Sequence, residues 1–213
     1  MNKPFRAALF DLDGTLIDSL DDICEALNQL RMSRHLPSTT PSEIRKWVGR
    51  GAEFLVQGTL PELSREELPD ASALYIQNYL NLKNPSVRLY PGVESTLGEL
   101  QSRGYCLGIV TNKASASADA VLKKLLPNIS FSEVAGPERV SYRKPHPAHL
   151  LEVLKRMRVE PAQAFFVGDD PVDQGCAKAA GVQFFGACYG FGHIEHGHDT
   201  TLERFQDILS AVE

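Results

Sequence analysis

The chain has 213 residues and a formal net charge of −5, with 43% hydrophobic and 23% charged residues. These values are ordinary for a globular protein with a substantial core, and the acidic balance excludes the basic footprint of a nucleic-acid-binding protein. Lys and Arg form no long cluster, and no apolar run approaches the roughly 20 residues of a membrane span, so we expect no membrane partner.

The N-terminus and the cysteines indicate a cytoplasmic protein. Few apolar residues precede Asp11, too few for the core of a signal peptide. The four cysteines are far apart and have apolar neighbours: Cys24, Cys106, Cys176 and Cys188. We therefore expect reduced, buried thiols in the cytoplasm.

A predicted buried strand at residues 7–10 ends directly before Asp11 and Asp13. Strand side chains repeat with period two, so both carboxylates project to the same side, at the strand end where open α/β sheets bind ligands. Two acids held this close stay ionised most easily beside a cation. The pattern favours a Mg²⁺ site with one carboxylate free to attack phosphorus; the alternative is a surface turn, where Asp and Gly are common.

Residues 18–84 show helical patterns and no strand-like run. The first pattern is an amphipathic helix, and others follow around 41–60 and 64–80. The apolar face of the first helix comprises Leu20, Ile23, Cys24, Leu27 and Leu30. We interpret the block as a small helical domain, residues 17–85, inserted after the first strand of an α/β domain that combines residues 1–16 and 86–213.

Strands and helices alternate in the rest of the chain. Further apolar runs predict strands at residues 106–110, 133–135, 164–167 and 183–187. Helical spacing occurs at Val93, Leu97 and Leu100, at Leu150, Leu154 and Met157, and at the alanines before Gly181. This order predicts the α/β class, with a Rossmann-like parallel sheet covered on both faces.

Polar side chains follow the predicted strand at 106–110. Thr111 and Asn112 offer a hydroxyl and an amide that can bind phosphate oxygens beside the N–H groups of the next helix, although such residues are also common in loops. Lys144, in a Lys-Pro setting, can neutralise charge on a transferring phosphoryl group. A solvated basic loop is its alternative interpretation.

The predicted strand at 164–167 runs into an acidic cluster. Asp169 and Asp170 supply hard oxygen ligands suited to Mg²⁺. Asp173 lies one turn into the next helix, where it can orient a ligand or hold Lys144. The alternative for one of the three is an acidic cap at the helix N-terminus.

Together these clusters resemble the haloacid dehalogenase (HAD) superfamily of phosphatases. The resemblance rests on DxDGT at 11–15, a hydrophobic-Thr-Asn run at 109–112, Lys144, and GDxxxD at 168–173, in the family's order. It implies a HAD α/β core with a small helical cap, and phosphoric monoester hydrolysis through an aspartyl-phosphate. Dehalogenases of the superfamily lack an acid at the position of Asp13, so the resemblance points away from them.

The resemblance implies a role for each catalytic residue. Asp11 would be the nucleophile, and Asp13 the acid that protonates the leaving oxygen and then the base toward water. Thr111 would hold the phosphoryl oxygens, with Asn112 supporting substrate or loop geometry. Lys144 would balance charge.

The resemblance also implies Mg²⁺ as the cofactor. The ion would be held by Asp11, the backbone carbonyl of Asp13, and Asp169, with Asp170 assisting. Asp173 would act from behind these ligands by orienting them.

Residues 44–53 resemble the cap segment of phosphoglycolate phosphatases, which implies 2-phosphoglycolate as substrate, with Gly49, Arg50 and Gly51 near it. Arg50 stands where those enzymes often have Asn. A guanidinium can hold a carboxylate through two hydrogen bonds; a solvent-facing cap residue is the alternative. Sugar-phosphate and amino-sugar-phosphate phosphatases, hexose-phosphate mutases and a degenerate phosphate-binding protein stay open as alternatives.

The expected partner is therefore a small phosphorylated metabolite, bound by a monomer or weak homodimer. His193, His196 and His198 lie close together among glycines. We expect a surface loop there without a resident metal, because the glycines leave the imidazoles without fixed geometry.

Overall fold

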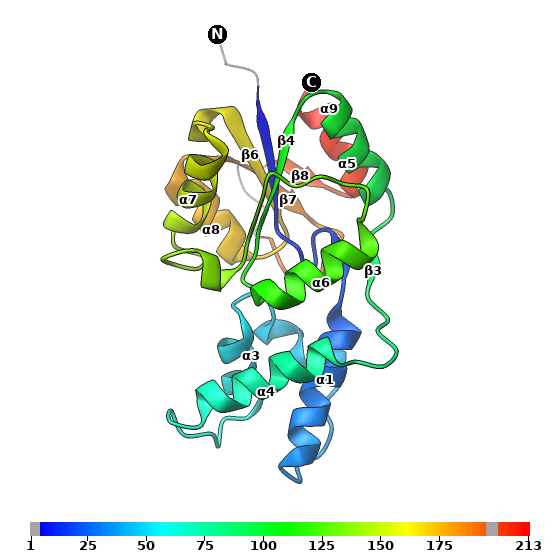
Figure 1. Ribbon diagram of the computed structural model, residues 1–213, viewed down its shortest axis with the longest axis vertical. Helices are drawn as coiled ribbons and strands as arrows, with labels where there is room; N and C mark the ends of the chain where they lie inside the picture. Colours follow the sequence, from blue (N-terminus) through cyan, green and yellow to red (C-terminus); the bar gives the residue numbers. More distant parts are fainter. Residues whose placement is uncertain (1–4, 195–199) are drawn as a thin grey trace.

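The computed structural model describes residues 5–194 and 200–213. Within them a sheet of parallel neighbours has the order β5-β4-β1-β6-β7-β8 (Figure 1). Its strands are β1 (Ala7–Phe10), β4 (Cys106–Val110), β5 (Glu133–Ala135), β6 (Ala164–Gly168), β7 (Gln183–Ala187) and β8 (Thr200–Leu202). The predicted Rossmann-like α/β fold is confirmed. Strand β8 was not predicted, because its sequence Thr-Thr-Leu contains a single apolar residue and shows no apolar run.

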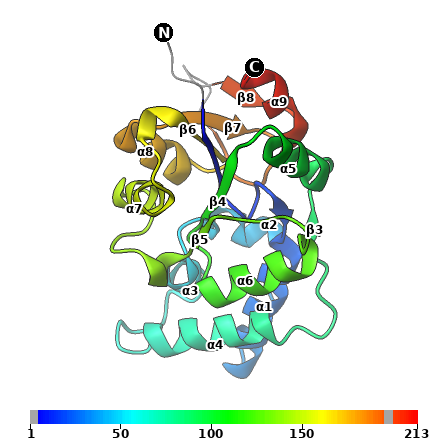
Figure 2. The ribbon, with the colours of Figure 1, turned by 45° about the horizontal axis from the view of Figure 1, so that its top comes forward.

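Helices cover both faces of this sheet (Figures 1 and 2). The helices α7 (Ala148–Met157) and α8 (Pro171–Ala180) lie on one face, and α5 (Val93–Ser102) and α9 (Ile208–Ala211) lie on the other. Leu9 packs in the layer of α7 and α8, whereas Phe10 packs in the layer of α5 and α9. The alternation follows from the period of two along a strand.

The remaining elements connect these layers. Helix α6 (Ser115–Leu125) follows β4 and lies against the helical unit described below (Figure 2). Short 3₁₀ turns occur at η2 (Pro137–Arg139), η3 (Pro161–Gln163) and η4 (Phe205–Asp207). Helix α8 ends at Gly181, which adopts a left-handed conformation with φ 69° as its sequence position predicted.

The register of the three central strands determines where the site forms. Strand β1 is fully buried between β4 and β6, with Phe10 opposite Ile109 and Val167. The carboxyl ends of all three strands therefore reach the same edge of the sheet. Residues that directly follow these ends meet there, as expected for an open parallel sheet.

A helical unit lies beyond this carboxyl edge (Figure 1). It consists of α1 (Leu20–Ser33), α2 (Pro41–Ile44), η1 (Arg45–Trp47), α3 (Ala52–Thr59) and α4 (Leu68–Leu80). Helices α1 and α4 pack against each other, and the apolar face predicted for α1 contributes to the core. The unit covers the edge where the polar residues collect.

Two short strands connect the helical unit to the sheet. β2 (Ile17–Asp18) and β3 (Arg88–Leu89) pair antiparallel, and the side chains of Arg88 and Asp18 form an ion pair. The expectation of no strand in residues 18–84 is therefore wrong at Asp18. Two-residue strands carry no readable pattern, and their pairing brings together segments that are distant in the chain.

The cysteines only partly follow the expectation. Cys24 and Cys176 are buried, but Cys106 and Cys188 are exposed, because Cys106 begins β4 and Cys188 follows the end of β7. None of the four is in a disulfide. Across residues 5–194 and 200–213, the helices lack the length and apolar character needed to cross a membrane.

Candidate active site

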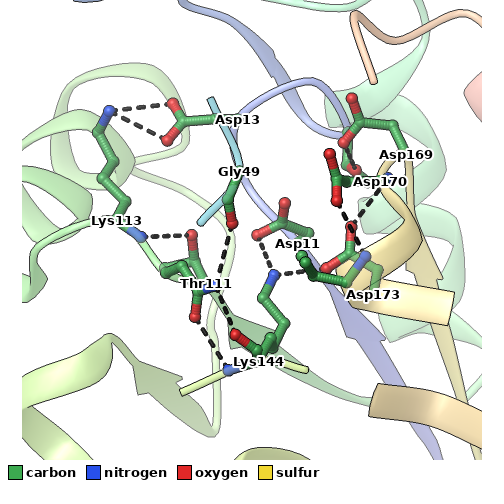
Figure 3. Close-up of polar contacts among 12 residues, drawn as sticks. Asp11, Asp13, Gly49, Thr111, Lys113, Lys144, Asp169, Asp170 and Asp173 are labelled. Carbon is green, nitrogen blue, oxygen red and sulfur yellow. Dashed lines mark hydrogen bonds and ion pairs between the residues drawn. The ribbon is translucent and has the colours of Figure 1, made fainter. Parts of the chain in front are cut away.

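Asp11 and Asp13 follow β1 at the carboxyl edge of the sheet, as predicted (Figure 3). The backbone N–H of Asp11 donates to the Val167 carbonyl at 2.9 Å, which continues the pairing with β6. Gly14 then turns the chain with φ 84°. Asp11 is buried, whereas Asp13 is half-buried and faces away from it toward Lys113.

Lys144 lies next to Asp11, although the two are far apart in sequence. Its Nζ lies 2.7 Å from Asp11 Oδ1 and 2.6 Å from Asp173 Oδ1, and its side chain is almost fully buried. Burial opposes the charged ammonium, but the two carboxylates outweigh this effect and raise the pKa of Lys144. Lys144 is therefore a permanent cation between two acids.

The backbone around Lys144 is held by neutral hydrogen-bonding partners. Its N–H donates to Asn112 Oδ1 at 3.1 Å and to His149 Nδ1 at 3.2 Å. Burial, together with the positive charge of Lys144, lowers the pKa of His149 to about 4. A neutral ring that accepts at Nδ1 carries its proton at Nε2, which lies 3.1 Å from the Ala135 carbonyl.

The carboxylates of Asp11, Asp169 and Asp173 converge, with one oxygen of each within 4.8 Å of the others. Burial raises the pKa of Asp169 well above its usual value, and the charges of Asp11 and Asp173 raise it further. Lys144 supplies one positive charge to this group. A hard divalent cation fits the remaining acidic oxygens.

Asp170 and Asp173 form reciprocal hydrogen bonds at the start of α8. Asp170 Oδ1 accepts from the Val172 N–H at 2.9 Å, and Asp173 Oδ2 accepts from the Asp170 N–H at 3.2 Å. The expected helix cap is thus Asp170, whose carboxylate is not among the three converging groups. Asp173, expected behind the ligands, lies within that group and beside Lys144.

Thr111 and Asn112 come directly after β4, as predicted, and Asn112 connects three parts of the site. Its Nδ2 donates to the Gly49 carbonyl and to the Lys144 carbonyl, both at 3.0 Å. Because Gly49 belongs to the helical unit, Asn112 ties that unit to the loop of Lys144. Thr111 Oγ1 accepts from the Lys113 N–H at 3.1 Å.

Gly49 and Gly51 line a pocket of about 50 Å³ between the helical unit and the sheet edge. Their φ angles of 100° and 93° suit glycine. The pocket is also lined by Asp11, Asp13, Ile23, Val48, Ala52, Leu55, Tyr75, Ile76, Tyr79, Thr111, Asn112, Lys113, Ala114 and Ser117. The helical unit thus contributes apolar groups, tyrosines and glycine backbone to it.

Arg50 does not line this pocket. Its guanidinium is 4.9 Å from the centre of the Phe54 ring, and the residue is exposed. It lines a separate hollow with Arg143, Lys144 and neighbouring apolar residues. The structure therefore separates Arg50 from Gly49 and Gly51, which its position in the sequence had grouped together.

Two parts of the site were not predicted from the sequence. Lys113 Nζ lies 3.0 and 3.2 Å from the two oxygens of Asp13; the residue was visible as the next position after Thr-Asn. The loop after β7 also reaches Asp169, whose Oδ2 accepts from the Gly192 N–H at 2.7 Å. Glycines at 190 and 192 were the available signal, because a Cβ at either position would overlap Asp169. Of the three histidines, His196 and His198 lie outside the described residues.

Gly14 offers a direct test of this packing. A Cβ at Gly14 would overlap the Asp169 carboxylate, whereas a Cβ at Gly104, which has φ 86° against 84°, would meet no atom within 4 Å. We expect Gly104→Ala to cost about 1 kcal/mol of unfolding free energy from backbone strain alone. Gly14→Ala should cost more unfolding free energy, measured by thermal melts, and should lower the catalytic activity of the site by at least about 10-fold, because it displaces a group beside Asp11. Equal effects of the two variants would contradict the assigned crowding.

The chain also matches known proteins along most of its length. Residues 8–187 match the model of the haloacid dehalogenase-like hydrolase family. A phosphoglycolate phosphatase from Mannheimia succiniciproducens is 35% identical over 100% of both chains. Phosphoglycolate phosphatase 1 from Pseudomonas aeruginosa is 32% identical, covering 98% of this chain and 80% of its own.

A crystal structure agrees with these relatives. A protein from Haemophilus somnus 129pt, described as a predicted phosphoglycolate phosphatase, superimposes with a TM-score of 0.89 at 31% identity and 98% coverage of both chains. The parallel sheet, the inserted helices and the acidic edge thus define an α/β protein with the fold of haloacid dehalogenase-like hydrolases. The chain belongs to the haloacid dehalogenase-like hydrolase family. Within that family it is a phosphatase that resembles the phosphoglycolate phosphatases.

Proposed function

We propose that this phosphatase hydrolyses 2-phosphoglycolate in two displacements, through a phosphorylated Asp11 and with Mg²⁺ as cofactor. The observation that carries the proposal is the buried Asp11 carboxylate, held at the pocket by Lys144 and facing the space beneath the helical unit. An aspartate is ionised at neutral pH and needs no base to attack phosphorus. The other residues of the site fit the remaining tasks.

In the first displacement, the Asp11 carboxylate attacks phosphorus and the bond from phosphorus to the ester oxygen breaks. Asp13 gives a proton to the leaving oxygen. Thr111 and Lys144 stabilise the transferring phosphoryl group through a hydroxyl and a positive charge. In the second displacement, Asp13 takes a proton from water, the water oxygen attacks phosphorus, and Asp11 is released with inorganic phosphate.

We propose Asp11, Asp169 and the backbone carbonyl of Asp13 as the groups that hold Mg²⁺, with Asp170 assisting. The convergence of Asp11 with Asp169 and the raised pKa of Asp169 support this placement, because a cation would relieve their mutual repulsion. When bound, the ion would neutralise charge on the phosphoryl oxygens. Asp173, paired with Lys144, would keep that lysine directed at Asp11.

Two observations support 2-phosphoglycolate over larger phosphate esters. Relatives that match nearly the whole chain are named phosphoglycolate phosphatases. The apolar wall that the helical unit gives the pocket suits a short organic group, since sugar hydroxyls would lose hydrogen bonds to water there. A sugar-phosphate phosphatase or a hexose-phosphate mutase is the alternative outcome of the test below.

We also propose a cap domain of residues 17–85 that encloses the substrate over the core domain of residues 1–16 and 86–213. The hydrogen bond from Asn112 to Gly49 and those from Arg45 to the Phe191 and Gly190 carbonyls support a closed arrangement. Closure would exclude water during the first displacement. The free cysteines accord with the cytoplasm as the compartment, and a monomer or weak homodimer remains our proposal.

The test is phosphate release from 2-phosphoglycolate and a set of sugar phosphates, with Mg²⁺ and with a chelator. We expect a strong preference for 2-phosphoglycolate that disappears on chelation. Asp169→Ala should raise the Mg²⁺ concentration for half-maximal rate by at least about 10-fold, because it removes a proposed ligand. The matched control is Asp70→Ala on the exposed face of α4. A preferred sugar phosphate would contradict the proposed substrate, and an unchanged Mg²⁺ dependence of the Asp169 variant would contradict the proposed metal site.

A further inference from the structure

Lys113 occupies a position that the proposed chemistry does not require. It follows Asn112 at the carboxyl edge of the sheet, and only 6% of its side chain is exposed (Figure 3). Its Nζ lies 3.0 and 3.2 Å from the two oxygens of Asp13 and 3.9 Å from the centre of the Tyr79 ring. An ammonium has three donors, so two toward Asp13 leave one for another acceptor.

Among the described residues that line the pocket, Lys113 is the one with a positively charged side chain. The other charged lining residues are Asp11 and Asp13, and the ammonium lies beside Asp13, one of the two acids that a phosphate ester must approach. Arg50 lines the separate hollow and is exposed. A substrate with a carboxylate besides its phosphate would find its nearest compensating charge at Lys113.

Tyr79 supplies a second, independent observation. The residue is only 8% exposed and lines the same pocket from α4, and apart from the nearby Lys113 ammonium, which can only donate, its buried hydroxyl has no hydrogen-bond partner among the described residues. Its O–H is therefore without an acceptor among these residues. A buried hydroxyl without a partner costs about 1–3 kcal/mol. A ligand group that accepts a hydrogen bond at this point would remove that cost.

We propose that Lys113 and the Tyr79 hydroxyl together bind the carboxylate of the substrate and make this enzyme selective for small carboxylated phosphate esters. The inference rests on the proposed function and assigns its specificity to two residues. The carboxylate accepts the free N–H of Lys113 and the O–H of Tyr79. The carbon between carboxylate and phosphate then lies along the apolar wall formed by Ile23, Val48 and Leu55.

The arrangement also explains why Lys113 contacts Asp13. Two carboxylates alone would repel an anionic substrate, whereas an ammonium between Asp13 and the incoming carboxylate offsets that repulsion. Lys113 therefore affects every substrate through Asp13. It affects carboxylated substrates more, because they make a direct contact with its ammonium.

The test compares kcat/KM for 2-phosphoglycolate with kcat/KM for ethyl phosphate, which is of similar size and lacks the carboxylate. The ratio of the two cancels losses that act through Asp13. We expect Lys113→Met to lower the ratio by about 10- to 100-fold, the value of a charge-assisted hydrogen bond, and Tyr79→Phe to lower it by about 5-fold. Lys124→Met, at an exposed position of α6, the helix that follows Lys113, is the matched control and should leave the ratio unchanged.

The outcomes separate this proposal from the proposed function. A wild-type enzyme without preference for 2-phosphoglycolate would contradict the proposed substrate. A wild-type preference that persists in both the Lys113 and Tyr79 variants would overturn only the present inference, as would a ratio that falls in Arg50→Ala instead.

Binding gives a readout that does not depend on turnover. In an Asp11→Asn background, titration calorimetry should show 2-phosphoglycolate binding about 5-fold weaker after Tyr79→Phe, with ethyl phosphate unaffected. Tyr79→Phe removes only one oxygen atom from α4. The comparison with and without this substitution therefore tests carboxylate binding even if Lys113→Met does not fold. Equal affinity in the two proteins would contradict the proposed role of Tyr79.

Discussion

Replacing Asp11 with Asn is expected to lower phosphate release by on the order of 10⁴-fold or more, because the proposed nucleophile is lost while the side-chain shape is kept. The folded protein should survive the change. Asp11 adds its negative charge to a buried acidic group and thereby raises the pKa of Asp169. Removing that charge relieves repulsion, so we expect the melting temperature to be unchanged or higher.

The measurement pairs a phosphate-release assay with a thermal melt of the same preparation. Asp70→Asn, an exposed site on α4, is the matched control for the loss of one carboxylate. Hydrolysis by Asp11→Asn at a rate near that of the wild type would exclude Asp11 as nucleophile. Loss of activity together with a collapsed melting transition would show that Asp11 acts on the fold, which contradicts the account given above.

Replacing Lys144 with Met is expected to lower both activity and stability. The ammonium lies between Asp11 and Asp173, and its removal leaves two buried carboxylates without their cation. Breaking a buried ion pair on one side typically costs about 3–5 kcal/mol of unfolding free energy. Lys155→Met, exposed on α7, is the matched control and should cost little.

The stability loss of Lys144→Met should depend on pH. Burial raises the pKa of Asp173 to about 7 although Lys144 opposes the shift, so the folded state binds more protons than the unfolded state between the ordinary carboxyl pKa and pH 7. Such a group contributes stability at low pH that is lost as pH rises. Without the opposing ammonium the pKa rises further, so the deficit relative to wild type should be larger near pH 8 than near pH 5.

Urea unfolding in metal-free buffer at these two pH values measures the deficit. If the loss of unfolding free energy is equal at both pH values, or larger at low pH, then repulsion between unpaired carboxylates is not its cause. The same series on the Lys155 variant shows whether the loss of any lysine charge produces such a dependence.

Local periodicity accounts for the parts of the fold that were predicted. Strands β1, β4, β5 and β7 have the predicted bounds, and β6 extends by Gly168 alone. Strands β1, β4, β6 and β7 are short apolar runs buried between two neighbouring strands, and β5 is a shorter run at the sheet edge beside β4. The apolar residues of each run are contiguous in the sequence, which makes such strands recognisable. Strands β2 and β3 have two residues each and pair with each other across the helical insertion, and β8 contains a single apolar residue, so no contiguous apolar run predicted any of the three.

The sequence alone determined the α/β class, the helical insertion and the placement of Asp11, Asp13, Thr111 and Asp169 at strand ends, because these depend on residues that are neighbours in the chain. The tertiary structure decided which side chains meet. It placed Lys144 between Asp11 and Asp173, used Asp170 as a helix cap, turned Arg50 to the surface and brought Lys113 to Asp13 and Tyr79. Those contacts join segments from separate strands, helices and loops, and their distances follow from how the layers pack, which spacing along the chain does not encode.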